Sequence, residues 1–448
     1  MRAKVLYSLL RGGRLLLSFC AVLAGAALFL GFEKLFPLAS CQFAPAFVRF
    51  LLCGSLTALA ALAVILLLTL IFGRVYCSFL CPLGSFMSFI ALFSRKGAKK
   101  IYPVTGGLIL GLTFGYLVFG LAYLFRALDP YSLFGRSVAA PLWFGLAFLL
   151  VILAVTLLFG RVFCTSFCPV GLILSLFARK SLFRFRFSSE CVGCGQCAKV
   201  CPAGCLDVKE RKVKNAFCLM CLDCFPACPK GGLSYEPGWK KEEAPQAPDL
   251  DRRKFLVNLA AGAAVGLAAG GVSKLLLDKR VKASGEKEFL TRPPGAMAED
   301  RFLSRCTACG LCAAACPRKI ITLGPLGGAP RLNFKKGSCD PACAKCSNVC
   351  PAGALKPLTP EKKRTLVIGK VSFEASKCIA FQGGECGKCA SWCPTNAITL
   401  RPNGTPKPEA EKCVGCGGCE NICPAGAMRV KGVPIQYFPE DATKGENA

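Results

Sequence analysis

Histidine is absent from this 448-residue chain, and the absence excludes several classes of chemistry. Without imidazole there is no histidine-ligated haem, no Rieske centre, no zinc site that uses histidine, and no histidine general base. Chemistry that moves only electrons, through metal held by sulfur, is compatible with this restriction. The sequence therefore predicts no haem and leaves sulfur as the element to examine.

Acidic residues are also few, since 26 Asp and Glu stand against 56 Lys and Arg, for a formal net charge of +30. Nucleic acid is not the expected partner, because the basic residues are scattered and form no patch interleaved with aromatic residues. Apolar residues, in contrast, make up 53% of the chain. They concentrate before residue 160, which indicates a membrane protein rather than an ordinary soluble enzyme.

Cysteine is abundant, with 32 residues, and its spacing excludes a disulfide framework. Most of the cysteines fall into six groups of four, nearly all followed directly by proline. The pattern C-x2-C-x2-C-x3-C-P holds [4Fe–4S] clusters in bacterial ferredoxins. Cysteines that form disulfides have no reason to repeat it six times. The sequence therefore predicts six [4Fe–4S] clusters.

Two regular runs lie in the middle of the chain and predict a two-cluster ferredoxin. In that arrangement the fourth cysteine of each run binds the other cluster. The first cluster is expected on Cys191, Cys194, Cys197 and Cys228, and the second on Cys218, Cys221, Cys224 and Cys201. Cys205 is left over, and we expect it to be structural.

Four more runs lie near the C-terminus and predict four further clusters. Two runs are regular and two have a longer first gap, which implies local insertions that leave the thiolates convergent. Their cysteines are Cys306, Cys309, Cys312 and Cys316; Cys339, Cys343, Cys346 and Cys350; Cys378, Cys386, Cys389 and Cys393; and Cys413, Cys416, Cys419 and Cys423. Spacing leaves two pairings open: sequence-adjacent runs, or the first with the fourth around the other two.

Four apolar segments in the first part of the chain are long enough to cross a bilayer as helices. They cover approximately Leu15–Leu38, Val48–Phe72, Val104–Phe125 and Pro141–Phe159. Lys and Arg are enriched in the N-terminus, in the 73–103 loop and in residues 160–190, so these parts are expected in the cytoplasm. This places residues 181–250 in the cytoplasm of a cell with a bacterial inner membrane.

The membrane part contains a repeat, FGRVYCSFLCPLG at 72–84 and FGRVFCTSFCPVG at 159–171. Each copy closes a helix pair, which suggests a twofold axis along the membrane normal. Each contributes C-x3-C-P, so Cys77 and Cys81, and Cys164 and Cys168, are expected one helical turn apart and able to meet. We consider a redox site, as a dithiol couple or a four-thiolate metal or cluster site, against simple packing of small residues.

Other residues of the membrane part carry weaker expectations. The stretches Ser85–Phe93 and Leu172–Phe177 resemble interfacial helices, which would either border a quinone pocket or only anchor the chain. Glu33 and Asp129 are the nearest carboxylates for proton transfer, with solvation in a loop as the alternative. The default interpretation of Cys20, Cys41 and Cys53 is packing.

Residues 236–250 have the composition of a linker, and the next residues, DRRKFL at 251–256, precede a mildly apolar segment that ends near Leu277. Twin arginines before such a segment are typical of a twin-arginine export signal. A fifth helix with a basic flank is the alternative. Both interpretations put the residues after about 280 outside the cytoplasm, and the lack of a clear cleavage site favours a retained anchor.

The predicted fold class is an α-helical membrane domain combined with α+β ferredoxin-like iron–sulfur domains. Its parts are a four-helix membrane domain (1–180), a cytoplasmic two-cluster ferredoxin (181–235), a linker with the signal or fifth helix (236–284), and a four-cluster domain outside the cytoplasm (285–448). This organisation predicts electron transfer between a membrane and a chain of clusters.

These motifs make residues 1–235 resemble the NapH-type membrane ferredoxins, and residues 250–448 the NapG/MauM-type ferredoxins. The C-x3-C-P pairs also resemble those of NosR-related membrane proteins. The resemblance implies a quinol dehydrogenase that passes electrons from menaquinol or ubiquinol to a periplasmic reductase such as nitrate reductase. It also carries the cluster ligands over to the cysteines named above. The fusion in one chain and the two variant runs depart from the family pattern.

The favoured function is oxidation of quinol from the membrane pool, with electrons relayed by [4Fe–4S] clusters to a periplasmic reductase or electron carrier. One alternative is a maturation or regulatory redox protein that reduces a metal or cofactor of a partner enzyme. Another is electron flow in the reverse direction, inward to the cytoplasmic pair. The sequence does not decide among them, although clusters with protein-tuned potentials serve all three.

Overall fold

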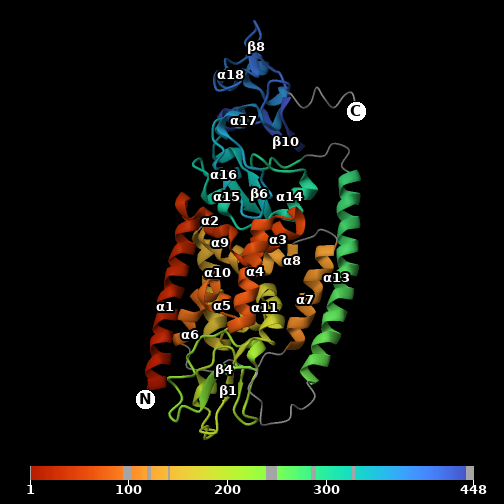
Figure 1. Cartoon of the computed structure of the whole chain (residues 1–448). Coiled ribbons are helices and arrows are strands. Elements are labelled where there is room, and N and C mark those ends of the chain that lie inside the picture. Colours follow the sequence, from red (N-terminus) through yellow and green to blue (C-terminus); the bar gives the residue numbers. More distant parts are fainter. Residues whose placement is uncertain are drawn as a thin grey trace. The chain divides into compact units, whose positions relative to one another are not determined.

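The computed structural model describes residues 2–93, 103–118, 123–139, 142–238, 250–283, 289–324 and 328–439. The chain divides into two compact units, 1–28 with 34–275, and 29–33 with 276–448. The first unit combines most of the apolar helices with the middle pair of cysteine runs. The second contains the four C-terminal runs. Figure 1 labels their elements.

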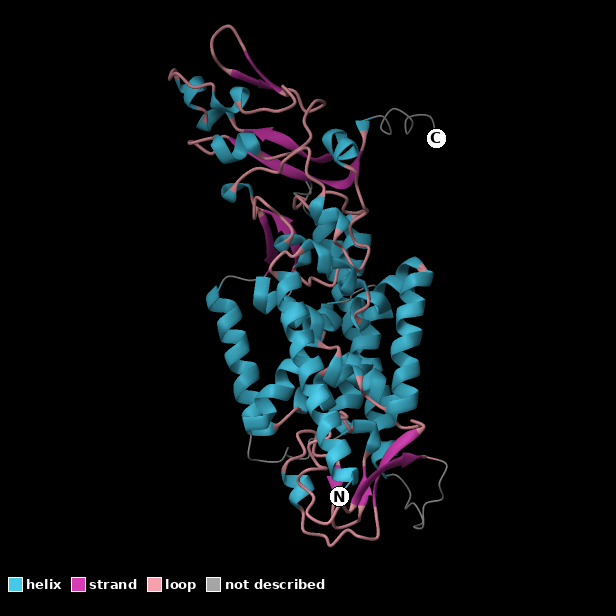
Figure 2. Ribbon diagram, turned by 60° about the vertical axis from the view of Figure 1, so that its left-hand side comes forward, coloured by secondary structure: helices cyan, strands magenta, loops and turns pink. Residues whose placement is uncertain are grey.

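The first unit is mainly helical (Figure 2). Its helices are α1 (Arg2–Phe29), α2 (Phe36–Ser40), α3 (Phe43–Cys53), α4 (Leu56–Phe72), α5 (Tyr76–Phe79), α6 (Pro82–Phe93), α7 (Pro103–Val118), α8 (Tyr123–Leu128), α9 (Pro130–Ala139), α10 (Leu142–Phe159), the π-helix η2 (Phe163–Phe167), α11 (Pro169–Ala178), α12 (Gln196–Lys199) and α13 (Leu250–Ala283). Its strands form two antiparallel pairs, β1 (Phe183–Phe187) with β4 (Leu233–Pro237), and β2 (Leu206–Asp207) with β3 (Lys212–Val213).

Two described helices are long and apolar enough to cross a membrane, Leu6–Phe29 within α1 and Arg253–Ser273 within α13. The outer surface of α1 carries exposed Leu16, Leu17 and Phe19. Exposed apolar side chains of this kind are suited to lipid. Shorter apolar helices include Leu56–Phe72 and Ala147–Phe159. The described structure thus contains two helices of spanning length where the sequence predicts four spans and a fifth helix.

The bounds of two predicted spans need correction. The first helix ends at Phe29 rather than Leu38, because Gly31 follows with a φ of +98°. The predicted span Val48–Phe72 is broken between α3 and α4 at Gly54, whose φ of +60° ends α3 in the left-handed region. The third predicted segment contains α7, and its residues 119–122 lie outside the described residues. The fourth predicted segment coincides with helix α10, Leu142–Phe159.

The two sequence repeats pack reciprocally. In the first repeat α4 leads through the motif into α6, and in the second α10 leads into α11. Helix α6 packs against α10, and α11 packs against α4. Each helix that follows a motif therefore lies against the helix that precedes the other motif. This exchange is the arrangement expected of a pseudo-twofold repeat.

Helices α6 and α11 are core elements and not the interfacial helices that the sequence suggested. Leu83 and Met87 of α6 and Leu172 and Leu174 of α11 are all at most 1% exposed. The basic residues predicted to follow α6, Arg95 and Lys96, lie outside the described residues. The buried, N-terminal part of each helix therefore does not lie at a membrane surface as an interfacial helix would.

Helix α13 packs against α7 through glycines. A Cβ on Gly111 of α7 would lie 2.2 Å from the Leu259 carbonyl oxygen, and one on Gly262 of α13 would lie 2.3 Å from that of Leu108. Glycines at this spacing let two membrane helices approach backbone to backbone. Figure 1 draws the two helices side by side. The segment with the twin arginines is therefore an integrated helix of the first unit.

The second unit contains short helices and paired strands around the cysteine runs. Its helices are α14 (Glu299–Arg305), α15 (Leu311–Ala314), α16 (Lys345–Asn348), α17 (Pro360–Thr365), α18 (Lys388–Ser391) and α19 (Gly418–Ile422). Its antiparallel pairs are β5 (Ile321–Gly324) with β6 (Gly328–Leu332), β7 (Val367–Phe373) with β10 (Met428–Tyr437), and β8 (Ile398–Leu400) with β9 (Pro406–Pro408). This is an α+β arrangement, as the sequence predicts.

Candidate iron–sulfur centres

The structure brings together the four cysteines that the sequence assigns to the first cluster of the middle pair. Cys191, Cys194, Cys197 and Cys228 line one pocket. The first three come from one run, and the fourth comes from the other. The thiol of Cys197 interacts electrostatically with the other three. This is the crossed geometry of a two-cluster ferredoxin.

The second set is assembled in the same crossed way, with one additional thiol. Cys224 lies within electrostatic range of Cys221, Cys218 and Cys201. Cys205, predicted to be merely structural, is buried with its Sγ 3.6 Å from that of Cys201. The hydrogen bond from Cys205 lowers the pKa of Cys201, which favours its thiolate form. Cys205 is therefore a partner of a predicted ligand.

Sequence-adjacent runs pair in the C-terminal unit, which resolves the alternative left open by spacing. One cavity is lined by Cys306, Cys309, Cys312 and Cys350, and another by Cys316, Cys339, Cys343 and Cys346. A third is lined by Cys413, Cys416, Cys419 and Cys393. Cys389 interacts with Cys386 and Cys423. Cys378, the remaining cysteine of these runs, is buried at 8% exposure.

These thiols are poorly suited to ionise without a metal. Burial raises the pKa of Cys309 to about 12 and that of Cys339 to about 11. The metal ligand is the thiolate, so iron binding must displace these protons. The cavities, the crossed sets of four and the soft sulfur donors fit [4Fe–4S] clusters.

The two pairs of the C-terminal unit meet at a buried lysine. The backbone N–H of Cys339 donates to the carbonyl of Cys416 over 2.8 Å, which joins the first pair to the second. Lys363 is 0% exposed and acts electrostatically on both of these cysteines and on Cys346. Its Nζ has no hydrogen-bond partner. The ammonium is thus placed to offset thiolate charge between two sets, a role for which the sequence gives no signal.

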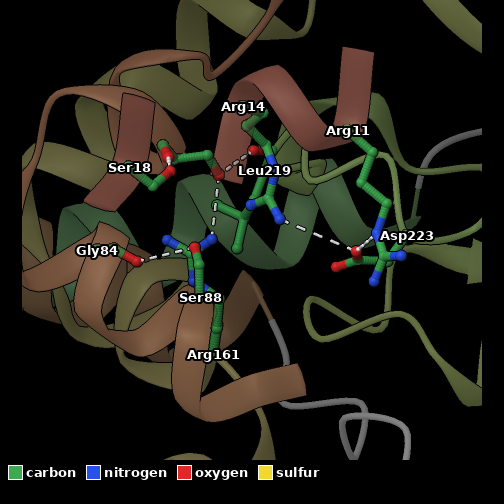
Figure 3. A network of polar contacts seen from close by, with 9 residues as sticks. Arg11, Arg14, Ser18, Gly84, Ser88, Arg161, Leu219 and Asp223 are labelled. Atoms are coloured by element: carbon green, nitrogen blue, oxygen red, sulfur yellow. Dashed lines mark hydrogen bonds and ion pairs between the residues drawn. The ribbon is translucent and has the colours of Figure 1, made fainter. Parts of the chain in front are cut away.

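In the first unit, helix α1 contacts the loop of the second cysteine set. Arg11 Nε donates to Asp223 Oδ1 over 2.6 Å, and Arg14 Nη2 lies 3.9 Å from the same oxygen. Asp223 stands between Cys221 and Cys224. Figure 3 shows both arginines directed from α1 toward this carboxylate. Tyr7 adds a stacked contact with Phe225 at 3.8 Å between ring centroids.

The repeated membrane motifs contact the same loop. Ser78 Oγ donates a short hydrogen bond to the carbonyl of Leu219, between Cys218 and Cys221. Arg161 Nη1 donates to Ser78 Oγ over 3.0 Å, and the Arg161 backbone N–H donates to the Pro202 carbonyl over 2.7 Å. Pro202 follows Cys201. Arg161 therefore connects the repeat to both chain segments that supply the second set.

The four motif cysteines are buried between the repeats, at 3–5% exposure. Arg74 of the first repeat donates to the carbonyl of Cys164 in the second, over 2.5 Å. Arg161 of the second donates to the carbonyl of Cys77 in the first, over 2.7 Å. Each Nη2 also lies near the first thiol of its own motif, at 3.6 Å for Cys77 and 3.8 Å for Cys164. The Gly-Arg that precedes each motif is the sequence signal for this exchange.

The sequence predicts the two cysteines of each motif one turn apart on a single helix. This prediction is wrong, because the second cysteine lies outside the helix of the first. Proline disfavours a helical conformation in the residue before it, so Cys168 is extended and begins α11. The Cys168 thiol accepts the Gly171 N–H at 3.3 Å, and the Cys81 thiol accepts that of Gly84 at 3.4 Å. Cys81 and Cys168 nevertheless interact electrostatically with each other and with Cys77 and Cys164. The four thiols are therefore near enough to influence one another electrostatically.

The structure also corrects expectations for isolated residues. Asp129 is 1% exposed, so solvation in a loop is wrong; its Oδ2 accepts the Ser132 N–H at 2.8 Å. Cys20 and Cys41 are exposed, so interior packing is wrong for them. Glu33 is exposed and pairs with Lys345. The side chain of Cys53 lies outside what the structure describes.

Comparison with known proteins agrees with these motifs. A 4Fe-4S binding domain model matches residues 55–100 and 141–189, a second matches 187–207, and a 4Fe-4S dicluster domain model matches 305–354 and 377–427. The ferredoxin-type protein MauM of Methylorubrum extorquens is 33% identical over 209 residues, covering 42% of this chain and 91% of the relative. NapG of Escherichia coli is 33% identical over 207 residues, covering 42% and 87%. No solved structure matches.

The fold, the sets of cysteines and the matching family models together define an iron–sulfur electron-transfer protein of the ferredoxin type. The chain belongs to the ferredoxin-type family that includes NapG and MauM, with a match to those relatives over 42% of its length. NapF of Escherichia coli, at 35% identity over 141 residues, covers 31% of this chain and 82% of its own.

Proposed function

We propose that the chain oxidises quinol in the membrane and passes the electrons, through six [4Fe–4S] clusters, to a reductase or electron carrier outside the cytoplasm. The membrane part is of the NapH type and the C-terminal part of the NapG type. The ligands are the six crossed sets of cysteines described above. When bound, each cluster supplies a one-electron carrier whose potential is tuned by hydrogen bonds and nearby charge.

One observation carries the proposal: the loop of the second cysteine set is attached directly to the membrane-type helices. Ser78 donates to Leu219, Arg161 to Pro202, and Arg11 pairs with Asp223. The set that contains Cys221 is therefore the membrane-proximal one of the middle pair. A ferredoxin that served only soluble partners would have no reason to bury its cluster loop against such helices.

The proposed topology places the middle pair in the cytoplasm and the C-terminal unit outside it. The lysine and arginine distribution supports this, because basic segments lie at the N-terminus and around residues 160–190. Arg11 and Arg14 of the N-terminal helix contact the middle pair, as expected of segments on the same side. Helix α13 provides the crossing between the two units, and its glycine contacts with α7 support a retained helix.

Quinol oxidation also releases protons, and Asp129 is the proposed acceptor. Its Oδ1 is buried and has no hydrogen-bond partner. The carboxylate interacts electrostatically with both Tyr76 and Cys81 of the first repeat. A buried acceptor atom without a donor is available to a quinol hydroxyl.

The direct test mixes a reduced menaquinone analogue with the full chain in phospholipid vesicles, under anaerobic conditions. We expect bleaching of the cluster absorbance and a rhombic EPR signal of reduced clusters. The proposal of quinol oxidation would be wrong if the intact clusters stay oxidised with the quinol analogue but are reduced by a chemical reductant. Reduction of a metal by the same preparation would then favour the maturation function.

A single substitution tests the proton acceptor. Asp129→Asn keeps the size of the side chain and removes its basicity, so we expect quinol-driven cluster reduction to slow at least tenfold, in the range of general-base catalysis. Iron content should be unchanged. Glu33→Gln, which alters an exposed carboxylate, is the matched control and should keep the wild-type rate. Equal rates in both variants would exclude Asp129 as the acceptor.

A further inference from the structure

The four thiols of the membrane repeats are more than the six predicted clusters require. We propose that Cys77, Cys81, Cys164 and Cys168 hold a seventh iron–sulfur core, between the two repeats. Each repeat supplies two of the thiolates, and Arg74 and Arg161 supply the counter-charge. The inference concerns cofactor binding and does not depend on quinol as the electron donor.

The first argument is charge. Arg74 and Arg161 are both 0% exposed, and no described carboxylate pairs with either. Arg74 Nε and Nη1 and Arg161 Nε are buried without a hydrogen-bond partner. Two uncompensated buried cations are expensive. An oxidised two-iron or four-iron core with four thiolates carries two negative charges, which the two guanidinium groups balance.

The second argument is the orientation of the helices. Cys81 stands before α6, of 12 residues, and Cys168 before α11, of 10 residues. Each thiol already accepts a backbone N–H of the first turn, from Gly84 and Gly171. A helix N-terminus favours negative charge. These N–H contacts therefore offset part of the cost of burying a thiolate, which is the form that binds iron.

The third argument comes from the rest of the chain. Where cysteine runs of the ferredoxin pattern meet, the chain places a buried, unpartnered cation beside them, Lys363. Arg74 and Arg161 stand in the same relation to the membrane thiols. The 4Fe-4S binding domain model that matches 55–100 and 141–189 spans both motifs. The same kind of environment thus occurs where two predicted cluster sets of the C-terminal unit meet.

A single metal ion fits the thiols less well. A tetrahedral ion with metal–sulfur bonds of about 2.3 Å requires sulfurs roughly 3.8 Å apart. In the described part of the chain no three cysteine, aspartate or glutamate side chains are close enough to hold one ion, and this includes the ferredoxin runs. The membrane thiols share this property with the ferredoxin runs, whose cysteines match the ligand pattern of multi-atom clusters.

The position gives the core a use. Arg161 touches the Cys77 carbonyl on one side and, through Ser78 and Pro202, the loops of the membrane-proximal set on the other. A core at the four thiols would accept or release one electron at a time without breaking a bond. It would extend the cluster chain into the helices, toward the far side of the bilayer.

The test compares full-length chains purified anaerobically. The variant Cys81→Ser with Cys168→Ser is compared with Cys20→Ser with Cys41→Ser, which changes two exposed cysteines. We expect the first variant to lose iron and acid-labile sulfide in equal amounts, about two per chain for a two-iron core and about four for a four-iron core. Mössbauer spectra then identify the core, and the control should lose neither.

Unchanged iron and sulfide in a folded variant would overturn the proposal. So would loss of zinc or copper without sulfide, which would indicate a thiolate-bound ion instead. The EPR signals of the remaining clusters report folding. If the double variant does not fold, Arg74→Gln provides the test, because it keeps all four thiols and removes one positive charge. The redox component assigned to the seventh core should then shift to lower potential, and an unshifted titration would contradict the proposal.

Discussion

At the scale of single residues, the notable feature is the buried cation without a carboxylate. Lys363, Arg74 and Arg161 are all fully buried beside cysteines, and each has side-chain nitrogens without a hydrogen-bond partner. An unpaired buried charge is destabilising unless something opposes it. Thiolate-bound iron would carry the opposing charge, and these residues would then connect the folding of the chain with its cofactors.

Lys363 provides a prediction with a matched neighbour. Lys363→Met keeps the length of the side chain and removes the charge between Cys339 and Cys416. We expect the clusters on these sets to reduce at a lower potential, because a positive charge favours the added electron. Lys362→Met alters the exposed lysine next to it and should leave the redox titration unchanged. Identical titrations of the two variants would contradict the role of Lys363.

The role of a residue could be predicted from the sequence where a cysteine pattern repeats. It could not be predicted where the role depends on packing. The crossed sets around Cys191 and Cys218 follow from spacing alone. The pairing of the C-terminal runs does not, because the same spacings serve either arrangement until β7 and β10 bring the last two runs together. Lys363 is one basic residue among many, and only its burial distinguishes it. Cys205 gave no signal beyond being left over.

At the scale of elements, the repeated motif is a helix break that lets two chain segments approach. A Cβ on Gly171 would lie 2.3 Å from the Cys164 carbonyl oxygen and 2.5 Å from Arg74 Nη2. One on Gly84 would lie 2.2 Å from the Cys77 oxygen. The glycine after each Cys-Pro therefore makes room for the arginine of the other repeat.

Substitution of that glycine should be costly. We expect Gly171→Ala to lower the free energy of unfolding by about 3 kcal/mol, since backbone or the buried arginine must shift. Gly12→Ala is the control, because Gly12 lies in α1 with nothing within 4 Å of its added Cβ. It should be neutral or stabilising by about 0.5–1 kcal/mol. Thermal unfolding in detergent measures both; equal stability would contradict the packing.

The contact between α7 and α13 provides a second prediction at this scale. Gly111→Leu should separate the helices and cost about 3 kcal/mol, because the Leu259 carbonyl lies where the side chain would start. Ala264→Leu changes an exposed position of α13 and should cost less than about 0.5 kcal/mol. Comparable losses in both variants would mean that α13 is not docked through its glycines.

Helix type was predictable from apolar runs, whereas helix bounds were not. The apolar run of α10 continues through Gly145 without a break in the helix, and its predicted bounds hold. The run Val48–Phe72 also reads as continuous, but Gly54 ends a helix inside it. Regularly spaced glycines are visible in both α7 (107, 111 and 115) and α13 (262 and 266). Locating helices by their apolar runs takes no account of this spacing. Which helices they join depends on the tertiary fold.

At the scale of the whole molecule, the chain combines two units that each carry cysteine sets of the ferredoxin type. The first unit joins apolar helices to a ferredoxin pair through Ser78, Arg161 and Asp223. The second carries four sets of cysteines in two crossed pairs that meet at Cys339 and Cys416. Sequence spacing predicted the number of sets. It could not tell which set of the middle pair faces the helices, because that depends on contacts between distant segments.

The central claim is that electrons pass between the membrane helices and the middle pair through the set of Cys201, Cys218, Cys221 and Cys224. The measurement is quinol-driven cluster reduction by rapid mixing, in chains with Cys221→Ser or Cys194→Ser. Loss of the membrane-proximal cluster in Cys221→Ser should abolish reduction of the remaining cluster of the pair. In Cys194→Ser the proximal cluster should still be reduced at the wild-type rate. Equal reduction of the remaining cluster in both variants would contradict the account.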